Sequence, residues 1–512
     1  MLAAVKQYKR FGYFILVGIF ALSGFGIVLY STLENGAGIW PDSVVYISVA
    51  RNLIEGNGFI MYDGSPLILW PPLYSILLAI FGKVFGADPL VLVPLINALT
   101  FGLVVFFAGL LILGSVYDHP ILIVAGLVIV MFSNLLFPVA VMALSDLLFV
   151  LITIISLYLV GRYLNNGNDK NLILFSISAT LSPLSRYIGL VLIIWGCLII
   201  CFHQKLSRKK KIKHLPLFLI ISTVPISIWA IRNYILDGSF FGIRQAPIFK
   251  LGEILSFGIS SITSWYFTGG VSTHISISIL VIVFCIFGIW LGLRGLNLLK
   301  NVETPKANFL LFSDLLVIIY LGSVILYSMT RYIAVNDMRT WSPIFIPLTL
   351  ILLIMIRRIF DHQQNSIIKV FIFALVALNF VFWLVFQIPQ LKTHLSSIRT
   401  NGYWLSDHSW KSSQTIQFLR ENTLECKVYS NAPDVIYILA DKETNLLPGR
   451  GNESIDVTTL KGQWPQEDQV CLVWFTNISR RILYTKDELL SITNMENFKQ
   501  FDDGVLYVVS RK

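Results

Sequence analysis

Long apolar runs separated by short polar segments dominate the first 390 residues of the chain. A run of about 20 apolar residues can cross a lipid bilayer as a helix. The pattern predicts about eleven such helices, near residues 11–33, 90–116, 121–137, 147–163, 172–184, 188–202, 215–231, 275–293, 309–329, 341–356 and 367–386. The pair 172–184 and 188–202 is short for two crossings and suggests a re-entrant hairpin, with Arg186 near the outer surface.

The polar segments predict the orientation of these helices. Lys6, Lys9 and Arg10 precede the first run, and a strongly basic stretch occupies residues 205–214. Lysine and arginine favour the cytoplasmic side of a membrane. We therefore expect a cytoplasmic N-terminus and, after an odd number of crossings, an extracytoplasmic C-terminus. The first run lacks a small-residue cleavage site and is long enough to span the membrane, so it predicts a signal anchor rather than a removed signal peptide.

Composition supports a membrane protein rather than a soluble one. The 512 residues are 55% hydrophobic, and the mean hydropathy is +0.73. The formal net charge of +10 would suit a nucleic-acid partner. The basic residues lie where a cytoplasmic face is predicted, so membrane topology explains them and we expect no nucleic-acid partner. The sequence predicts a multi-pass protein of the cytoplasmic (inner) membrane, in contact with membrane lipids.

The first long polar segment, residues 34–90, is expected to carry function. It holds Asp42, an amphipathic helix over residues 43–56, and the sequence Trp70-Pro71-Pro72. The helix pattern is typical of a segment lying in the membrane interface. Long ordered loops are often functional.

From about residue 390 the pattern becomes that of a soluble domain. Helices are predicted at 406–421, 434–439 and 486–491, and strands at 427–430, 470–476 and 505–509. We therefore divide the chain into a transmembrane domain, residues 1–389, and a small extracytoplasmic α/β domain, residues 390–512. Cys426 and Cys471 could pair in such a domain, but we favour two unpaired cysteines.

The candidate chemistry is a set of charged residues that the predicted topology places on one side of the membrane. Soluble-enzyme motifs such as Walker A, GxSxG, HExxH and CxxC are missing. Charges near a membrane are costly and tend to be paired or functional. Each one alone could be an interfacial anchor, and Asp42 could be the N-cap of helix 43–56. The acidic members are Asp42, Asp146, Glu55, Asp63 and Asp337, and the basic ones Arg186, Arg232, Arg331 and Arg339.

Carboxylates and arginines at such an interface suit a phosphate carried on a long lipid. Arginines would neutralise the phosphate as a leaving group. A carboxylate would deprotonate or orient an incoming hydroxyl or amine. A carboxylate that caps a helix has a lowered pKa and is a weak base, so Asp42 could instead orient the nucleophile or bind a metal.

Several segments resemble those of one family, and the resemblance covers roughly residues 10–390. Asp42 with the following helix, Gly56-Asn57-Gly58-Phe59 and Trp70-Pro71-Pro72-Leu73-Tyr74 are similar to the first extracytoplasmic loop of GT-C glycosyltransferases. The closest group contains the protein O-mannosyltransferases and the lipid A aminoarabinose transferase. Further matches are Ala143-Leu144-Ser145-Asp146-Leu147-Leu148, Leu184-Ser185-Arg186-Tyr187-Ile188-Gly189, Arg232-Asn233-Tyr234 and Gly238-Ser239.

The resemblance implies transfer of a sugar from a polyprenyl-phosphate donor, with inversion, to an extracytoplasmic glycan, lipid or protein. It makes Asp42 and Asp146 the catalytic candidates. Arg186, Arg232, Arg339 and Arg331 become candidates for the donor phosphate, and Glu55, Asp63, Tyr46 and Trp70 for the acceptor or the cleft. A divalent metal ion would be held by Asp42 and Asp146, although Ser43 stands where family members often have a second acid.

A secondary transporter or a flippase for lipid-linked sugars is the alternative. Charges inside the membrane would then mark a permeation path, and related halves with broken helices would be expected. The sequence has no such pairing, and its charges gather at one face. A scaffold for the C-terminal domain is a third possibility, but it would not need an elaborate first loop.

Overall fold

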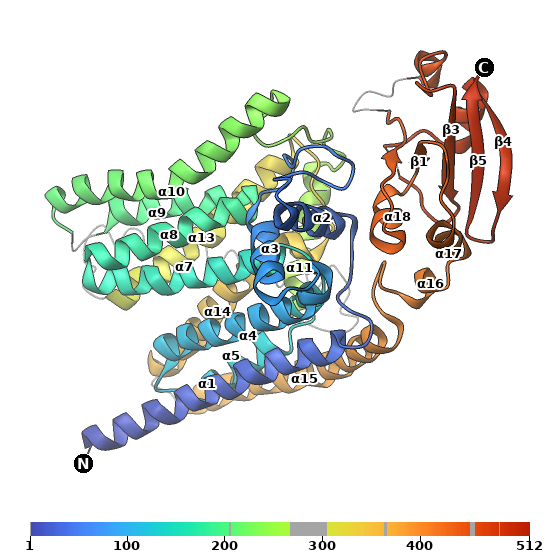
Figure 1. Ribbon diagram of the computed structural model, residues 1–512. Helices are drawn as coiled ribbons and strands as arrows, with labels where there is room; N and C mark the ends of the chain where they lie inside the picture. The colour runs from blue at the N-terminus through green and yellow to red at the C-terminus, as the bar shows by residue number, and fades with distance from the viewer. Residues whose placement is uncertain (1, 204–205, 267–304, 363–365, 451–455, 481) are drawn as a thin grey trace.

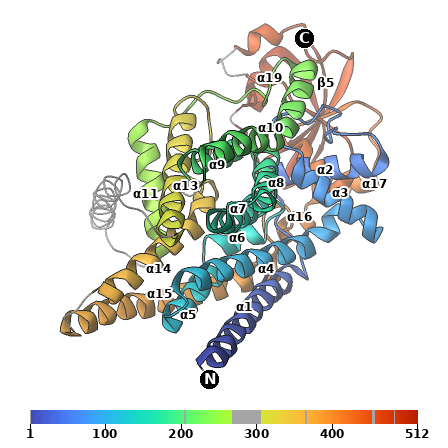
Figure 2. The ribbon, with the colours of Figure 1, turned by 90° about the vertical axis from the view of Figure 1, so that its left-hand side faces the viewer.

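The structure is a computed structural model that describes residues 2–203, 206–266, 305–362, 366–450, 456–480 and 482–512. A bundle of helices makes up the first four-fifths of the chain, and an α/β domain lies at one end of the bundle (Figure 1). Figures 1 and 2 show helix α1 beside α4 and α15. The ends of the apolar region in the sequence therefore meet in space.

Seven described helices contain a stretch long and apolar enough to cross a membrane. In the last of them, α15, mean hydropathy reaches 2.4 although only 11% of that stretch is buried within the chain. Such an apolar surface needs lipid or protein against it. The chain is a multi-pass membrane protein, and its seven long helices are α1 (Leu2–Thr32), α4 (Pro89–Val116), α7 (Asp146–Asn166), α10 (Arg208–Asp237), α13 (Pro305–Ser328), α14 (Phe345–His362) and α15 (Ser366–Asn401).

Shorter elements complete the bundle. They are α2 (Pro41–Glu55), α3 (Leu73–Phe85), α5 (Pro120–Met131), α6 (Leu136–Ala140), α8 (Asp169–Ser185), η1 (Tyr187–Gly189), α9 (Leu190–Phe202), α11 (Leu251–Tyr266) and η2 (Met338–Ile344). Ten of the eleven expected crossings fall on described helices, and the one at 275–293 lies outside the described residues.

Three helices differ from the expected pattern. The crossing expected at 121–137 ends at Met131 because the Ser133 hydroxyl accepts hydrogen bonds from the amides of Leu135 and Leu136, which starts α6. Helix α3 lies inside the first polar segment, where no second helix was predicted. Helix α15 continues to Asn401, past the residue where the soluble domain was expected to begin.

The C-terminal domain is built on a five-stranded mixed sheet. Its order is β2-β1-β3-β5-β4, with β1 parallel to β2 and β3, and β5 antiparallel to β3 and β4. The helix expected at 406–421 is two helices, because Ser413 caps a new start. The domain comprises α16 (His408–Lys411), α17 (Gln414–Glu421), β1 (Val428–Ser430), α18 (Pro433–Ala440), β2 (Asn445–Leu446), η3 (Val457–Leu460), β3 (Gln469–Phe475), α19 (Lys486–Ile492), β4 (Thr493–Gln500) and β5 (Gly504–Arg511).

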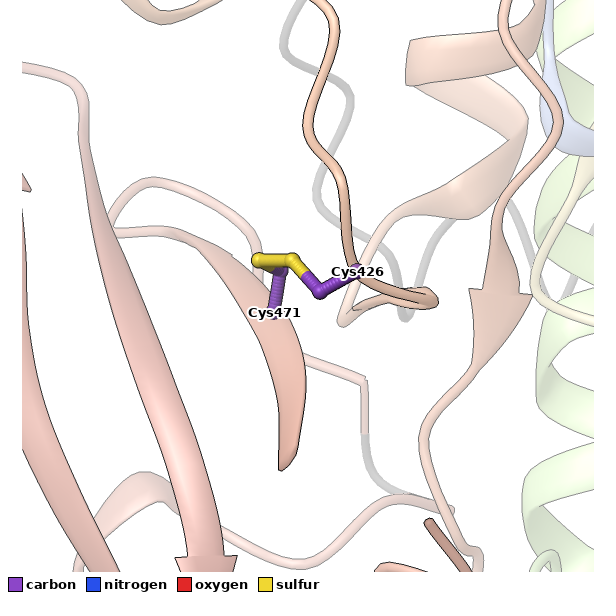
Figure 3. Close-up of a disulfide and its surroundings, with 2 residues drawn as sticks. All are labelled: Cys426 and Cys471. Atoms are coloured by element: carbon purple, nitrogen blue, oxygen red, sulfur yellow. A yellow bond between two sulfur atoms is a disulfide. The ribbon is translucent and has the colours of Figure 1, made fainter. Parts of the chain in front are cut away.

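Cys426 and Cys471 form a disulfide, so the preference for two unpaired cysteines was wrong (Figure 3). Cys426 lies just before β1, and Cys471 lies in the neighbouring strand β3 opposite Val428. The Cys471 amide donates to the carbonyl of Lys427 at 3.0 Å, and the two Cα atoms are 5.6 Å apart. Strand pairing thus brings the cysteines within disulfide range.

The C-terminal domain packs on the first polar segment. Helix α18 contacts α2 (Figure 1), and the Tyr62 and Tyr437 rings lie 5.5 Å apart. Arg51 of α2 lies over the Tyr437 ring and pairs with Asp88 at 2.7 Å. The domain therefore covers the end of α2 that is farther from Asp42.

Candidate active site

A short parallel ladder sets the start of α2 against the start of α7. The Gly38 amide donates to the carbonyl of Val141 at 2.8 Å, and the amide of Ala143 donates to the Gly38 carbonyl at 2.9 Å. In this ladder Gly38 pairs with Met142, and an aspartate follows each of them by four residues. The two paired segments run in the same direction, so Asp42 and Asp146 leave the ladder at the same end.

A third segment lies beside this ladder. The Leu405 amide, just after α15, donates to the Ile39 carbonyl at 3.3 Å. A Cβ at Gly38 would lie 2.6 Å from a ring carbon of Tyr403. Position 38 therefore needs glycine for the three segments to approach one another.

Asp42 lies in the first turn of α2 and is half-buried. It is not the N-cap, which corrects one interpretation of the sequence: Trp40 occupies that position, and its amide donates to the Ser43 hydroxyl at 2.9 Å. Among the residues that the structure describes, no donor forms a hydrogen bond with the Asp42 carboxylate.

The electrostatic surroundings of Asp42 contain both signs of charge. Burial raises the pKa of this carboxyl above its ordinary value, and the neighbouring Asp146 adds to the rise. Arg339, Arg186 and Arg244 act in the opposite direction but do not cancel it. The raised pKa makes Asp42 a stronger base than a capping carboxylate would be, which removes the objection to a proton-accepting role.

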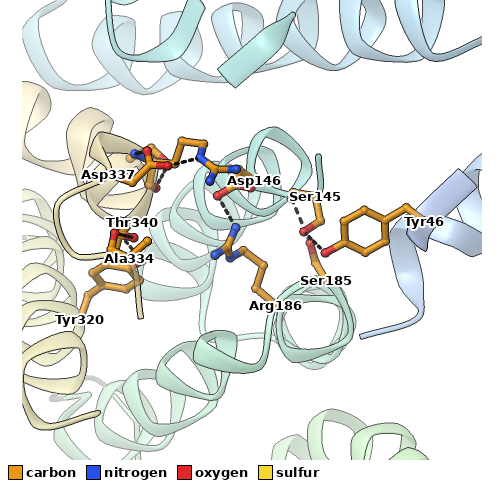
Figure 4. A network of polar contacts seen from close by, with 11 residues as sticks. Tyr46, Ser145, Asp146, Ser185, Arg186, Tyr320, Ala334, Asp337 and Thr340 are labelled. Carbon is orange, nitrogen blue, oxygen red and sulfur yellow. Dashed lines mark hydrogen bonds and ion pairs between the residues drawn. The ribbon is translucent and has the colours of Figure 1, made fainter. Parts of the chain in front are cut away.

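Asp146 and Arg186 form an ion pair at the centre of the site (Figure 4). Asp146 is the first residue of α7, and its side chain is 4% exposed; that of Arg186 is 35% exposed. Arg186 has an extended backbone between α8 and η1, so its side chain leaves the chain where the helix is interrupted. Only Nη1 of Arg186 contacts Asp146, which leaves other guanidinium donors for a ligand.

The interruption that places Arg186 depends on close packing at Gly189. The Ser182 hydroxyl donates to the Gly189 carbonyl at 3.0 Å. A Cβ at Gly189 would lie 2.4 Å from the Ser182 carbonyl carbon and hydroxyl. No side chain fits there without moving the turn that carries Arg186.

Arg339 joins the site from η2. Its Nε donates to Asp337 at 2.7 Å, and its guanidinium lies 4.6 Å from the centre of the Trp40 ring. Figure 4 shows η2, where the Tyr320 hydroxyl donates to the Thr340 carbonyl at 2.8 Å. These contacts hold η2 against the bundle and keep Arg339 next to Trp40, the N-cap of α2.

Two of the predicted arginines lie elsewhere. Arg232 donates to the carbonyls of Leu67 and Phe59, and its guanidinium lies 4.6 Å from the Trp229 ring centre. Arg232 therefore joins the first loop to α10 by hydrogen bonds. Arg331 is exposed, and within the described ranges its side chain makes no hydrogen bond or ion pair.

The other acidic candidates also lie outside the cluster. Glu55 is exposed at the far end of α2 and accepts a hydrogen bond from Asn57. Asp63 is exposed and accepts from Ser65, and it lines a pocket of about 540 Å³ whose other walls include Lys427 of the C-terminal domain.

Tyr46 and Trp70 contribute to packing. The Tyr46 hydroxyl lies 3.0 Å from the Ser145 hydroxyl (Figure 4). The buried Tyr46 ring meets that of Tyr74 edge-on. Tyr46 thereby joins α2 to the start of α7. Trp70 is partly buried and packs against two hydrophobic clusters of the loop and bundle.

Sequence reasoning missed Arg244, whose charge acts on Asp42. It lies in the second long polar segment, and its Nη2 donates to the Leu69 carbonyl at 3.3 Å. The nearby Gly242 has φ +79°, and a Cβ there would lie 2.9 Å from Leu69 Cα. The one feature of the sequence that could have pointed to Arg244 is a glycine two residues before it, where the two loops meet.

The donor set does not fit a divalent metal ion. Within the described parts of the chain, no three His, Cys, Asp or Glu side chains come together at one point. Asp146 pairs with Arg186, and both carboxylates face positive charge. We therefore derive no step through a metal.

The fold is GT-C-like, as the resemblance predicted. The chain is similar to ArnT from Cupriavidus metallidurans in the apo state, with a TM-score of 0.58, 13% identity, and 98% of each chain covered. The same protein bound to undecaprenyl phosphate matches with a TM-score of 0.58, 13% identity, and 97% and 98% coverage. The oligosaccharyltransferase AglB from Archaeoglobus fulgidus, in complex with an inhibitory peptide and a dolichol-phosphate, matches with a TM-score of 0.54, 12% identity, and 92% and 70% coverage.

No known sequence family matches the chain, and no curated protein matches it by sequence. The likeness to ArnT and AglB is one of fold.

Proposed function

We propose that the chain is an integral-membrane glycosyltransferase that takes a sugar from a polyprenyl-phosphate donor and passes it, with inversion, to an extracytoplasmic acceptor. The proposal rests on the cluster of Asp42, Asp146 and Arg186. Three separate elements of the bundle bring these side chains together. Lipid phosphates in the solved structures of similar fold, ArnT and AglB, support the same kind of donor.

In the proposed reaction, an acceptor hydroxyl attacks the anomeric carbon on the face opposite the phosphate. The glycosidic bond forms as the bond between that carbon and the phosphate oxygen breaks, and polyprenyl phosphate departs. Asp42, which has no hydrogen-bond donor of its own among the described residues, accepts the acceptor's proton. Arg186 and Arg339 stabilise the charge of the departing phosphate.

Asp146 has a positioning role in this proposal. Its ion pair fixes the guanidinium of Arg186, and its negative charge raises the pKa of Asp42. The roles of Arg232 and Arg331 in donor binding are not pursued, because Arg232 is engaged with loop carbonyls and Arg331 is exposed away from these contacts.

The test compares cell-envelope glycans and lipids by mass spectrometry in cells lacking the gene, cells with the wild-type gene, and cells with Asp42→Asn. We expect a glycosylated product only with the wild-type gene, because Asn cannot accept the proton. General-base loss typically costs a factor of about 10² to 10⁴ in rate. Lys83→Ala, which removes an exposed cation from α3, is the control and should leave the product unchanged.

A product at wild-type level in the Asp42→Asn cells would contradict the proposal. A flippase would give a different result, because it moves a lipid-linked sugar without forming a new glycosidic bond. Loss of the gene would then leave the donor in place and create no missing linkage.

A further inference from the structure

Trp404 has a backbone conformation that is unusual for so large a residue. It lies in the turn between α15 and the C-terminal domain, with φ +58°. Side chains rarely adopt this left-handed region, and for a bulky residue it is a true outlier. Glycine would adopt it without strain. Strained residues of this kind cluster at functional sites, which makes position 404 a candidate for one.

The Trp404 ring does not serve the hydrophobic core. Its side chain is 46% exposed, whereas the following Leu405 is 4% exposed and occupies the core position of the turn. Burial therefore does not account for a tryptophan here. A partly exposed ring gains less free energy from leaving water than a buried ring does.

The ring lies at the candidate active site. Its centre is 4.1 Å from that of Trp40, and a β-bridge joins Trp404 to Ile39. The Trp40 ring in turn lies 4.6 Å from the guanidinium of Arg339, and Trp40 precedes Asp42 by two residues. Two adjoining indoles thus lie at the start of α2 next to Arg339, and the outer one, that of Trp404, is partly exposed.

We propose that Trp404, whose ring lies against Trp40, is a stacking surface for a sugar ring bound at the site. This proposal rests on the proposed function, because it assigns the sugar that the transferase would hold. One face of a pyranose carries mainly C–H groups, which pack on the flat aromatic face, while the hydroxyls point outward to water and to polar groups. Arg339, whose guanidinium lies against the Trp40 ring, is a neighbouring polar group for those hydroxyls.

A sugar fits the surroundings better than an isoprenoid tail does. Beyond the buried Leu405, the next residues are polar: Ser406, Asp407 and His408. The turn comes after the last apolar helix has ended at Asn401. An isoprenoid tail would instead meet the apolar faces of the long helices, which are exposed and need lipid. An aromatic ring with polar neighbours suits a sugar, which has an apolar C–H face for the ring and hydroxyls for the polar surroundings.

The test measures contact between the full-length protein in detergent and methyl glycosides by saturation-transfer NMR. The probes are a set of methyl hexopyranosides and methyl pentopyranosides, with undecaprenyl phosphate lacking any sugar as a separate probe. We expect ring C–H signals from at least one glycoside with the wild-type protein. Trp404→Phe should retain a weaker signal, and Trp404→Gly should lower affinity at least tenfold.

The same substitution tests whether Trp404 is merely structural. Trp404→Gly relieves the left-handed strain, so its Tm should equal or exceed that of the wild type. Phe498→Ala removes another exposed ring, 59% exposed on β4, and should leave glycoside signals unchanged.

Four results would overturn the stacking surface. Three of them are no glycoside signal with the wild-type protein, an unchanged signal in Trp404→Gly, and a lower Tm in that variant. An equal loss of undecaprenyl phosphate binding would point to the lipid tail and would also overturn it. The two proposals fail separately. Glycoside contact without any transfer in cells removes the proposed reaction, whereas transfer with unchanged contact in Trp404→Gly removes only the stacking surface.

Discussion

At the scale of single residues, the decisive balance is between burial and charge at Asp42. Three arginines favour the ionised carboxylate, yet burial outweighs them, and the pKa remains above its ordinary value. A carboxylate with a raised pKa accepts a proton more readily than an ordinary one. This balance, rather than the mere presence of an acid, suits Asp42 to act as the base.

The raised pKa predicts the acidic side of the pH profile. Asp42 acts only when deprotonated, so the transfer rate should fall as the pH drops through the pKa of this carboxyl. That midpoint should lie above 3.8, the ordinary value for aspartate. Transfer by the purified protein, measured across acidic pH with its fold monitored by circular dichroism, gives the midpoint. A midpoint at or below 3.8 would show that the arginines outweigh burial.

The sequence predicted Asp42, Asp146, Arg186 and Arg339 as site residues, and the structure brings these four together. Charge and predicted sidedness were enough for them, because Asp146, Arg186 and Arg339 lie at the ends of apolar runs and Asp42 directly precedes the helix predicted over 43–56. The same reasoning also selected Arg232, which the structure shows bonded to loop carbonyls. Sidedness alone cannot distinguish a guanidinium that faces a ligand from one that faces backbone.

At the scale of elements, an interrupted helix positions the arginine of the ion pair. The sequence predicted two short apolar runs around Arg186, and α8 and α9 are separate helices at those places. It did not predict α3, whose apolar run is too short for a crossing, or β4, whose residues are mostly polar and exposed. Only the first residue of β4 is buried, so the strand has no buried face to give the alternating pattern that identifies a strand.

Gly189→Ala tests the interrupted helix. The added methyl group would lie 2.4 Å from Ser182, so we expect a loss of about 1–3 kcal/mol of stability, together with weaker transfer as Arg186 moves. Thermal unfolding in detergent and the transfer assay measure the two effects. Gly114→Ala in α4, where a Cβ would meet nothing within 4 Å, is the matched control and should be neutral or stabilising. Equal behaviour of the two variants would argue against a packed turn at Gly189.

At the scale of the whole molecule, the C-terminal domain covers one end of the first loop while the turn that precedes it reaches the site. Contacts between α2 and α18 and the bridge at Ile39 both join the two regions. The sequence predicted the domain's main strands, but it could not predict the pairing of Cys426 with Cys471. That pairing depends on which strands are neighbours. Parallel strands are joined by long connections, so no short turn motif in the sequence identifies β1 and β3 as a pair.

The disulfide predicts both stability and location. It joins cysteines 45 residues apart, and removing such a link typically costs about 2–4 kcal/mol. Cys426→Ser with Cys471→Ser should therefore lower the Tm of the C-terminal domain. Disulfides persist in oxidising compartments, so alkylation of the protein in whole cells should leave both thiols unmodified until a reductant is added. Modification of both without reductant would place the domain in the cytoplasm.

The most direct test of the central claim is the affinity of the purified protein for undecaprenyl phosphate, compared between wild type and Arg186→Lys by native mass spectrometry. Lysine keeps the charge beside Asp146 and so protects the fold, but it lacks the planar fork of donors that arginine offers to a phosphate. We expect affinity to fall about tenfold, which corresponds to about 1.4 kcal/mol, with no change in Lys83→Ala. Equal affinity in wild type and Arg186→Lys would contradict the claim that this cluster holds the lipid-linked phosphate.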